Sequence, residues 1–512
     1  IEYAIFPQWW LRMKPLAEEV LKGLRRGDIA FVPERWKKVN IDWLENVKDW
    51  NISRQLWWGH QIPAWYCEDC QAVNVPKPER YLEDPTSCEA CGSPRLKRDE
   101  DVFDTWFSSA LWPLSTLGWP EETEDLKAFY PGDVLVTGYD ILFLWVSRME
   151  VSGYHFMGER PFKTVLLHGL VLDEKGQKMS KSKGNVIDPL EMVERYGADA
   201  LRFALTYLAT GGQDIRLDLR WLEMARNFAN KLYNAARFVL LSREGFQAKE
   251  DTPTLADRFM RSRLSQGVEE ITALYEALDL AQAAREVYEL VWSEFCDWYL
   301  EAAKPALKAG NAHTLRTLEE VLAVLLKRLH PLMPFLTSEL YQALTGKEEL
   351  ALEAWPEPGG RDEEAERAFE ALKQAVTAVR ALKAEAGLPP AQEVRVYLEG
   401  ETAPVGENLE VFRFLARADL LPERPAKALV KAMPRVTARM PLEGLLDVEE
   451  WRRRQEKRLK ELLALAERSQ RKLASPGFRE KAPKEVVEAE EARLRENLEQ
   501  AERIREALSQ IG

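Results

Sequence analysis

Apolar residues recur along the chain with two different periods. In the first 200 residues, short apolar runs end at glycine, as in the segments 133–138 (Asp-Val-Leu-Val-Thr-Gly) and 164–169 (Thr-Val-Leu-Leu-His-Gly). Such runs are typical of buried parallel strands that each end in a turn. From about residue 200 to 345, Ala, Leu, Arg and Glu recur at helical spacing, which predicts a region of long helices.

The remainder of the chain contains two further patterns. A break rich in Pro and Gly at 356–360 precedes a predicted helix at about 363–386 and a short strand at 394–398. Residues 446–512 contain almost no turn residues outside the segment 474–478. On both sides of this segment, mostly apolar residues alternate at spacings of three and four, at Leu459, Leu462, Ala466, Ser469 and Leu473 and then at Leu494, Leu498, Ala501, Arg505 and Leu508. Two such seams predict an antiparallel helical hairpin, and spacing alone also allows a dimerising coiled coil.

These patterns predict a multidomain fold that combines α/β and all-α parts. A chain of 512 residues is too long for one ordinary hydrophobic core. We expect an α/β domain at 1–200, a helical domain at 201–345, a small α/β domain at 346–445 and the hairpin at 446–512.

Composition narrows the class of protein without settling its partners. Hydrophobic residues make up 46% of the chain and charged residues 30%, which is typical of a soluble globular protein. No apolar run approaches the roughly 20 residues that span a bilayer, so we expect no membrane association. The net charge of −13 does not exclude nucleic acid, because only the contacting faces must meet phosphate.

Four of the five cysteines form two tight pairs, Cys67 with Cys70 and Cys88 with Cys91. Each pair presents two thiolates from one turn, and four thiolates complete a closed tetrahedral zinc shell. The spacing therefore predicts a structural Zn²⁺ in a knuckle at about 62–98, and cysteines used in this way favour a reducing, cytoplasmic location. The fifth cysteine, Cys296, lies among aromatic residues and is expected in a helical core.

The segment with the clearest chemistry is a lysine loop at 176–184, bounded by Gly176 and Gly184. Ammonium groups on such a loop suit the charge that grows on a departing pyrophosphate, and glycine hinges let the loop close over a nucleotide. Asp188 and Pro189 then predict the N-cap and first turn of a helix. The loop itself reads Lys178-Met179-Ser180-Lys181-Ser182.

This five-residue string is the second signature of class I aminoacyl-tRNA synthetases, which the chain resembles along its whole length. The segments 51–60, 104–113 and 226–234 are similar to valyl-tRNA synthetases in particular, although the first is shared with isoleucine enzymes. The C-terminal hairpin resembles the tRNA-binding coiled coil of valine enzymes. The second cysteine cluster with which isoleucine enzymes often end is absent from the sequence.

The resemblance implies a reaction and a role for each domain. Valine would be joined to tRNA(Val) through a valyl-adenylate made from ATP, with Mg²⁺ expected beside the ATP. The domain at 1–200 would form the second half of a Rossmann-like catalytic sheet, and the helical domain at 201–345 would bind the anticodon. The domain at 346–445 would be a linker, and the hairpin would contact the tRNA backbone. We expect the protein to be a monomer.

The resemblance also implies roles for individual residues of the lysine loop. Lys178 and Lys181 are expected to be catalytic, because they would stabilise the pentavalent phosphorus and the departing pyrophosphate. Met179, Ser180 and Ser182 belong to the same ATP-binding loop.

Further residues match the family's adenosine and amino-acid sites. Gly138 and Asp140 match a turn that receives adenosine, and His168 and Gly169 match the turn at the adenine side. Two others match positions that wall the amino-acid side chain, forming a small apolar slot suited to valine. These are Trp106 and Ile141.

The sequence departs from the family in two respects. The first class I signature, His-x-Gly-His, is missing, since no two of the five histidines lie three residues apart. The editing domain of the family is also missing. The resemblance therefore implies a C-terminal fragment that makes no adenylate alone. The alternatives are a fragment of an isoleucine enzyme, a non-catalytic tRNA-binding protein derived from a synthetase, and a zinc-stabilised scaffold with a dimerising coiled coil.

Overall fold

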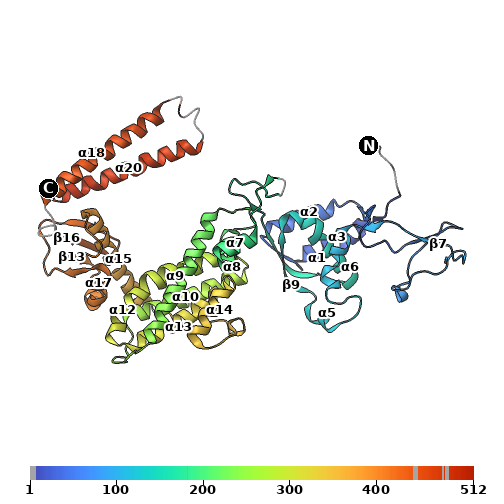
Figure 1. Cartoon of the computed structure of the whole chain (residues 1–512), viewed down its shortest axis with the longest axis horizontal. Coiled ribbons are helices and arrows are strands. Elements are labelled where there is room, and N and C mark those ends of the chain that lie inside the picture. The colour runs from blue at the N-terminus through green and yellow to red at the C-terminus, as the bar shows by residue number, and fades with distance from the viewer. Residues whose placement is uncertain (1–6, 181–182, 442–447, 476–477, 479–483, 512) are drawn as a thin grey trace. The chain divides into compact units, whose positions relative to one another are not determined.

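The computed structural model describes residues 7–180, 183–441, 448–475, 478 and 484–511 (Figure 1). The chain divides into two compact units. The first comprises Ile1–Ala225 with Leu274–Ala283, and the second comprises Arg226–Ala273 with Ala284–Gly512. None of the described helices is long and apolar enough to cross a membrane.

The first unit is built on a three-stranded parallel sheet. Strand β10 (Phe162–His168) lies between β2 (Ala30–Val32) and β9 (Gly132–Gly138). The two predicted parallel strands are thus confirmed, but the predicted burial is wrong for β9. Its Val134 and Val136 are 42% and 57% exposed. Alternate side chains of a strand point to opposite faces, and only the face of β9 that carries Leu135 is covered by described residues.

Helices α1 (Met13–Arg26), α2 (Arg35–Glu45) and α6 (Ser147–Met157) form the core of this unit with the sheet. The apolar residues of α1 recur at helical spacing, and Val20 and Leu24 are completely buried. A 3-10 turn, η2 (Tyr139–Ile141), and a π-helical turn, η3 (Leu142–Val146), connect β9 to α6.

Two smaller elements complete the parts of the first unit that concern function. Strands β5 (Trp65–Cys67), β6 (Val73–Asn74) and β7 (Leu96–Arg98) form an antiparallel sheet within the predicted knuckle. Helix α3 (Thr105–Ala110) begins where the side chain of Asp104 accepts a hydrogen bond from Trp106 N.

The second unit begins with the long helices that the sequence predicts. They include α10 (Leu255–Glu276), α12 (Leu300–Ala309), α13 (Ala312–Leu329) and α14 (Pro334–Thr345). Cys296 is buried in this bundle, and burial raises the pKa of its thiol to about 12. The structure therefore confirms Cys296 as a core residue.

A small α/β layer follows the bundle. Helix α15 (Glu363–Ala386) has the predicted bounds, and it packs on a sheet of order β14-β13-β16-β15. The strands are β14 (Ala418–Leu420), β13 (Val394–Gly400), β16 (Val436–Met440) and β15 (Leu429–Ala432). The buried Lys383 of α15 donates hydrogen bonds to the carbonyls of Ala416 and Arg417 at 2.8 and 2.9 Å.

Helices α18 (Val448–Ala474) and α20 (Lys484–Ile511) pack together along their length as the predicted hairpin (Figure 1). The predicted seam of α18 is confirmed, because Leu462, Ala466, Ser469 and Leu473 are buried and Leu459 is partly buried. The turn that joins the helices lies largely outside the described residues.

The predicted seam of α20 is wrong at two positions. Leu498 is 48% exposed and Arg505 is also exposed, whereas Asn497 and Ile504 are partly buried. Neighbouring residues differ by about 100° around a helix, so a one-residue error moves a side chain off the contact stripe. The buried and partly buried positions along this side of α20 include Glu490, Leu494, Asn497, Ala501, Ile504, Ala507 and Leu508.

One polar contact lies inside this hairpin. Ser469 Oγ donates to Glu490 Oε1 at 2.7 Å, and Lys472 Nζ lies 2.9 Å from Glu490 Oε2. These hydrogen bonds, the one from Lys472 first, lower the pKa of the Glu490 carboxyl.

Candidate functional site

The two predicted nucleotide turns meet at the carboxyl edge of the parallel sheet. Gly138 ends β9 and is the register partner of His168, which ends β10. Ligands of open α/β sheets bind at this edge, outside the carboxyl ends of the strands. A Cβ on Gly138 would lie 2.6 Å from Asp140 Oδ1, so a side chain here would force this carboxylate to move. His168 Nδ1 lies 2.8 Å from the carbonyl oxygen of Gly169.

Gly169 is constrained by the protein itself. A Cβ at this position would lie 2.0 Å from the carbonyl oxygen of Gln213. The neighbouring Asp214 joins the two turns, since its Oδ1 accepts from Tyr139 OH at 2.9 Å and from Leu170 N at 2.9 Å. Sequence reasoning missed Asp214, whose only local signal is the preceding Gly-Gly pair.

The lysine loop follows strand β11 (Val171–Leu172), and Lys178 pairs with Leu172 as an isolated bridge. Lys178, Met179 and Ser180 are described, whereas Lys181 and Ser182 lie outside the described residues. Both bounding glycines have left-handed backbone, with φ of 76° at Gly176 and 64° at Gly184.

A clamp that the sequence did not reveal holds the two ends of this loop. Asn185 Nδ2 donates to Asp173 Oδ2 at 2.8 Å, and Asn185 Oδ1 accepts from Ser180 N at 2.9 Å. Asp173 also accepts from Gln177 N at 2.7 Å. These hydrogen bonds, the one from Asn185 first, lower the pKa of Asp173. Helix α7 (Pro189–Tyr196) then begins with Asp188 as its N-cap, as predicted.

Trp106 lines a cavity of about 670 Å³ in the first unit, together with Trp43, Trp50 and Arg148. An ion pair between Arg54 and Asp104 lies in the wall of this cavity. The guanidinium of Arg148 lies 3.5 Å above the ring of Trp50, and burial lowers its pKa. Ile141, predicted as the partner of Trp106, lies in η2 and is not one of the residues that line this cavity.

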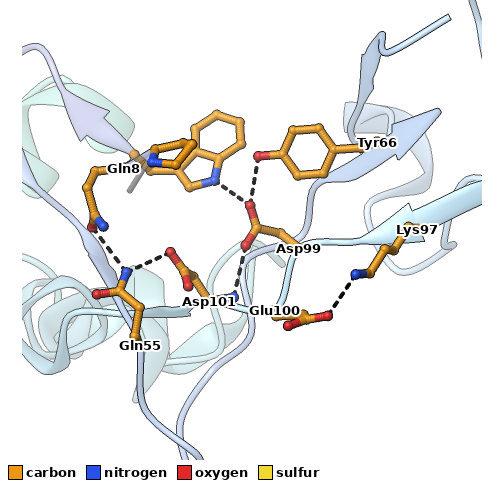
Figure 2. Close-up of a pocket in the computed structure, with 9 residues that line it drawn as sticks. Gln8, Gln55, Tyr66, Lys97, Asp99, Glu100 and Asp101 are labelled. Carbon is orange, nitrogen blue, oxygen red and sulfur yellow. Dashed lines mark hydrogen bonds and ion pairs between the residues drawn. The ribbon is translucent and has the colours of Figure 1, made fainter. Parts of the chain in front are cut away.

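A second cavity, of about 590 Å³, lies beside the knuckle (Figure 2). Asp99 accepts hydrogen bonds from Trp9 Nε1 at 2.7 Å and from Tyr66 OH at 2.9 Å, and Gln55 Nε2 donates to Asp101 Oδ2 at 2.9 Å. Burial, and then Asp99, raises the pKa of Tyr66 to about 12. The side chains of this cavity bind one another, and none of them belongs to the predicted site.

The segment 51–60, which resembles the synthetase family, is buried near its beginning and exposed to solvent near its end. Ser53 is buried and donates to Gln8 Oε1 at 2.8 Å. Trp57 and Trp58 are 102% and 90% exposed, so they contribute nothing to the core of the first unit.

The four paired cysteines converge on one point. Their sulfur atoms lie within 4.8 Å of one another, with 3.6 Å between Cys67 and Cys91 and 3.5 Å between Cys70 and Cys88. A tetrahedral zinc with Zn–S bonds of about 2.3 Å requires sulfur separations of roughly 3.8 Å, so this set fits the ion.

The backbone of the knuckle favours a thiolate at Cys88. The residue after each Cys-x-x-Cys pair has left-handed backbone, with φ of 62° at Gln71 and 73° at Gly92. Burial acts to raise the pKa of Cys88, but hydrogen bonds from the backbone of Cys91 and Ala90 outweigh it and lower the pKa to about 6. At Cys91 a hydrogen bond with the backbone of Ser93 acts to lower the pKa, but contacts with the thiols of Cys70 and Cys67 raise it to about 12. The arrangement can hold a metal ion with all four ligand positions occupied.

Comparison with known families matches three consecutive parts of the chain. Residues 2–218 match the family of class I tRNA synthetases for isoleucine, leucine, methionine and valine. Residues 257–398 match the anticodon-binding domain of tRNA ligases, and residues 447–512 match the tRNA-binding arm of valyl-tRNA synthetases.

Curated relatives match the whole chain. A valine–tRNA ligase from Thermus thermophilus is 98% identical over all 512 residues, and those from Deinococcus radiodurans and Thermotoga maritima are 49% and 45% identical. The chain spans only 59–60% of the length of these relatives.

Solved structures support the fold. The LeuRS of Agrobacterium radiobacter in a complex with tRNA covers 62% of the chain, with a TM-score of 0.51 and 23% identity, and the chain covers 43% of it. Methionyl-tRNA synthetase of Mycobacterium tuberculosis with methionyl-adenylate covers 65%, with a TM-score of 0.52 and 20% identity, and the chain covers 62% of it.

Proposed function

The chain belongs to the class I aminoacyl-tRNA synthetases, and from this premise we propose that it forms part of a valine–tRNA ligase. The observation that carries this proposal is the 98% identity to the Thermus thermophilus valine–tRNA ligase over all 512 residues. The proposed reaction joins valine to ATP, releases pyrophosphate and transfers the valyl group from the adenylate to tRNA(Val).

The carboxyl edge of the sheet is the proposed adenosine site. The close approach of Asp140 to the backbone of Gly138 leaves a carboxylate beside a Cβ-free surface, and a carboxylate suits a ribose hydroxyl. His168 and Gly169 would border the adenine, because they end the neighbouring strand in register.

The lysine loop is proposed to act on the phosphates. Charge accumulates on pyrophosphate as it leaves, so ammonium groups placed there stabilise the transition state more than the bound substrate. Lys178 and Lys181 would supply these groups, and Met179, Ser180 and Ser182 would complete the ATP-binding loop. Mg²⁺, expected with the ATP, would supply further positive charge beside the phosphates. The Asp173–Asn185 clamp supports this role, since it fixes the ends from which the loop extends.

The amino-acid pocket is proposed at Trp106. Ile141 is proposed as a second wall from the family resemblance alone, because it does not line the cavity beside Trp106. A rigid indole and a branched aliphatic side chain form a slot that excludes larger side chains by size. Such a slot rejects threonine poorly, because threonine resembles valine in shape.

The zinc ion is proposed to be structural and to be held by Cys67, Cys70, Cys88 and Cys91. When bound, it would supply fold stability to the knuckle, which has few buried apolar residues of its own. The helical part of the second unit and the hairpin of α18 and α20 are proposed to contact tRNA(Val), because they match anticodon-binding and tRNA-arm families.

Amino-acid-dependent ATP–pyrophosphate exchange tests the proposal. We would compare this chain with the same chain joined to the part of the Thermus thermophilus relative that it does not match. Valine, isoleucine, leucine and threonine would be offered to both. We expect exchange with valine, weaker exchange with threonine and none with isoleucine in the joined chain, and none in the present chain alone. A preference for isoleucine would replace the substrate, and no exchange by a folded joined chain would leave only a tRNA-binding protein.

A further inference from the structure

One face of α2 follows the segment that carries Asp140 and Ile141. Trp36 stacks on Tyr139 with ring centres 5.2 Å apart and planes 11° apart. Two turns along α2, Trp43 stacks on Phe143 at 5.2 Å and 15°. Asn40 lies between the two tryptophans on the same face, because residues four and seven apart share one side of a helix. Helix α2 thus contacts the segment through one ring stack before Asp140 and another after Ile141.

Asn40 adds a polar contact between these two stacks. Its Nδ2 donates to Glu150 Oε2 at 2.8 Å, and its Oδ1 accepts from Ser147 Oγ at 2.6 Å. All three side chains are completely buried. Both ends of the Asn40 amide are therefore used, and its orientation is fixed by the first turn of α6.

Glu150 has an unusual environment for a carboxyl group. Its Oε1 has no hydrogen-bond partner among the described residues. Burial raises the pKa of Glu150 to about 8, against which the hydrogen bond from Asn40 acts only in part. Helix α1 presents apolar side chains to α6, and Tyr154, one turn along α6 from Glu150, donates its hydroxyl to Asp28 Oδ2 at 3.0 Å. No ion-pair partner of this carboxyl lies among the described residues, so its surroundings favour the protonated form.

We propose that Asn40, Ser147 and Glu150 are positioning residues that hold the segment 139–143 in place, since Ser147 Oγ also lies 3.1 Å from the carbonyl oxygen of Leu142 in this segment. Their role rests on the proposed function, because they act on the adenosine and amino-acid residues named there. They touch no substrate and work only through the segment they hold.

The π-helical turn η3 explains why such positioning residues are needed. A π-turn is rare compared with an α-helical turn, so it is not the conformation that the local chain favours unaided. Its conformation therefore depends on neighbours, and here α2 supplies them through two ring stacks and one amide. Ionising Glu150 would place an unpaired charge inside this contact, and hydrating that charge requires α2 and α6 to separate.

The test uses the joined chain described above and valine-dependent pyrophosphate exchange between pH 6 and 10. Asn40→Ala removes the amide, Glu150→Gln preserves the neutral shape, and Glu18→Gln on the exposed side of α1 is the matched control. We expect Asn40→Ala to raise the KM for valine or ATP by about tenfold with a smaller change in kcat, because misplaced binding groups weaken ground-state contacts. We expect Glu150→Gln to match the unmodified protein at pH 7 and to keep its activity above pH 8, where the unmodified protein loses it.

Three results would overturn the proposal. The first is an Asn40→Ala protein that unfolds at lower temperature but keeps both KM values, since this would make the contact merely structural. The second is a Glu150→Gln protein with the same alkaline loss as the unmodified protein. The third is a Glu18→Gln protein that reproduces either effect. A failure of the proposed function is distinguishable from these, because the unmodified joined chain would then show no valine-dependent exchange at any pH.

Discussion

The buried Glu150 carboxyl leads to a stability prediction that needs no enzymatic assay. In the unfolded chain this group loses its proton near its ordinary pKa of 4.5, whereas in the folded protein it keeps the proton to about pH 8. The folded state therefore binds more protons than the unfolded state between these values, so the free energy of unfolding falls as pH rises. Glu150→Gln removes this proton linkage and should stabilise the protein at neutral and alkaline pH.

The magnitude follows from the two pKa values. At pH 7 the difference in proton binding between the two states has acted over 7 − 4.5 = 2.5 pH units. This corresponds to a free energy of unfolding that is about 3 kcal/mol higher for the glutamine protein. Below pH 4.5 this difference in unfolding free energy vanishes, and above pH 8 it levels off at about 5 kcal/mol. Between pH 5 and pH 9 the difference in unfolding free energy should thus grow by about 4 kcal/mol.

Urea unfolding at pH 5, 7 and 9, followed by tryptophan fluorescence, measures this difference for the first unit. Glu18→Gln is again the control, and we expect its effect to stay within about 0.5 kcal/mol at all three values. A constant difference between Glu150→Gln and the unmodified protein across the pH series would refute the reasoning. It would mean that the carboxyl is already ionised in the folded state at pH 5.

Four further changes test other parts of the structure. Cys88→Ser should abolish zinc retention and loosen residues 62–98 while leaving helical circular dichroism nearly unchanged; zinc analysis and hydrogen exchange would measure this, and retained stoichiometric zinc would contradict it. Asn185→Ala should raise the KM for ATP in pyrophosphate exchange by about tenfold, because both ends of the lysine loop lose their clamp, and an unchanged KM would exclude that role. Lys383→Met should destabilise the second unit by about 3 kcal/mol in urea unfolding, since buried carbonyls lose a charged donor, and a neutral result would contradict the contacts. Ala501→Lys should lower the melting temperature of the hairpin whereas Leu498→Lys should not, and an equal loss from both substitutions would restore the seam expected from sequence.

Local signals account for most of what the sequence predicted correctly. Helix α15 has its expected bounds because acidic residues begin it and Gly387 ends it, and Asp188 caps α7 as its position before Pro189 indicates. The cysteine knuckle was predictable for the same reason, since each pair closes its own turn. Such features depend on residues within one turn of each other.

The residues that sequence reasoning missed act over long distances along the chain. Asp214 binds Tyr139 and Asn40 binds Glu150, and these pairs are 75 and 110 positions apart. An isolated Asp or Asn has no pattern that identifies such a partner. The seam of α20 failed for a related reason: Leu498 is more apolar than Asn497, but the phase of the stripe is set by the partner helix. The division into four domains and the roles of the site residues stay predictions.

The polar contact inside the hairpin favours one register of α20 against α18. If α20 slid along α18 by one heptad, Glu490 would face apolar side chains and lose both Ser469 and Lys472. Such a slip would also displace the helix by about 10 Å, at 1.5 Å per residue. Apolar residues alone tolerate sliding, because one leucine can replace another in the seam. A single buried carboxylate with two hydrogen-bond donors disfavours the other registers. The hairpin therefore has one preferred length among the several that its apolar residues would accept.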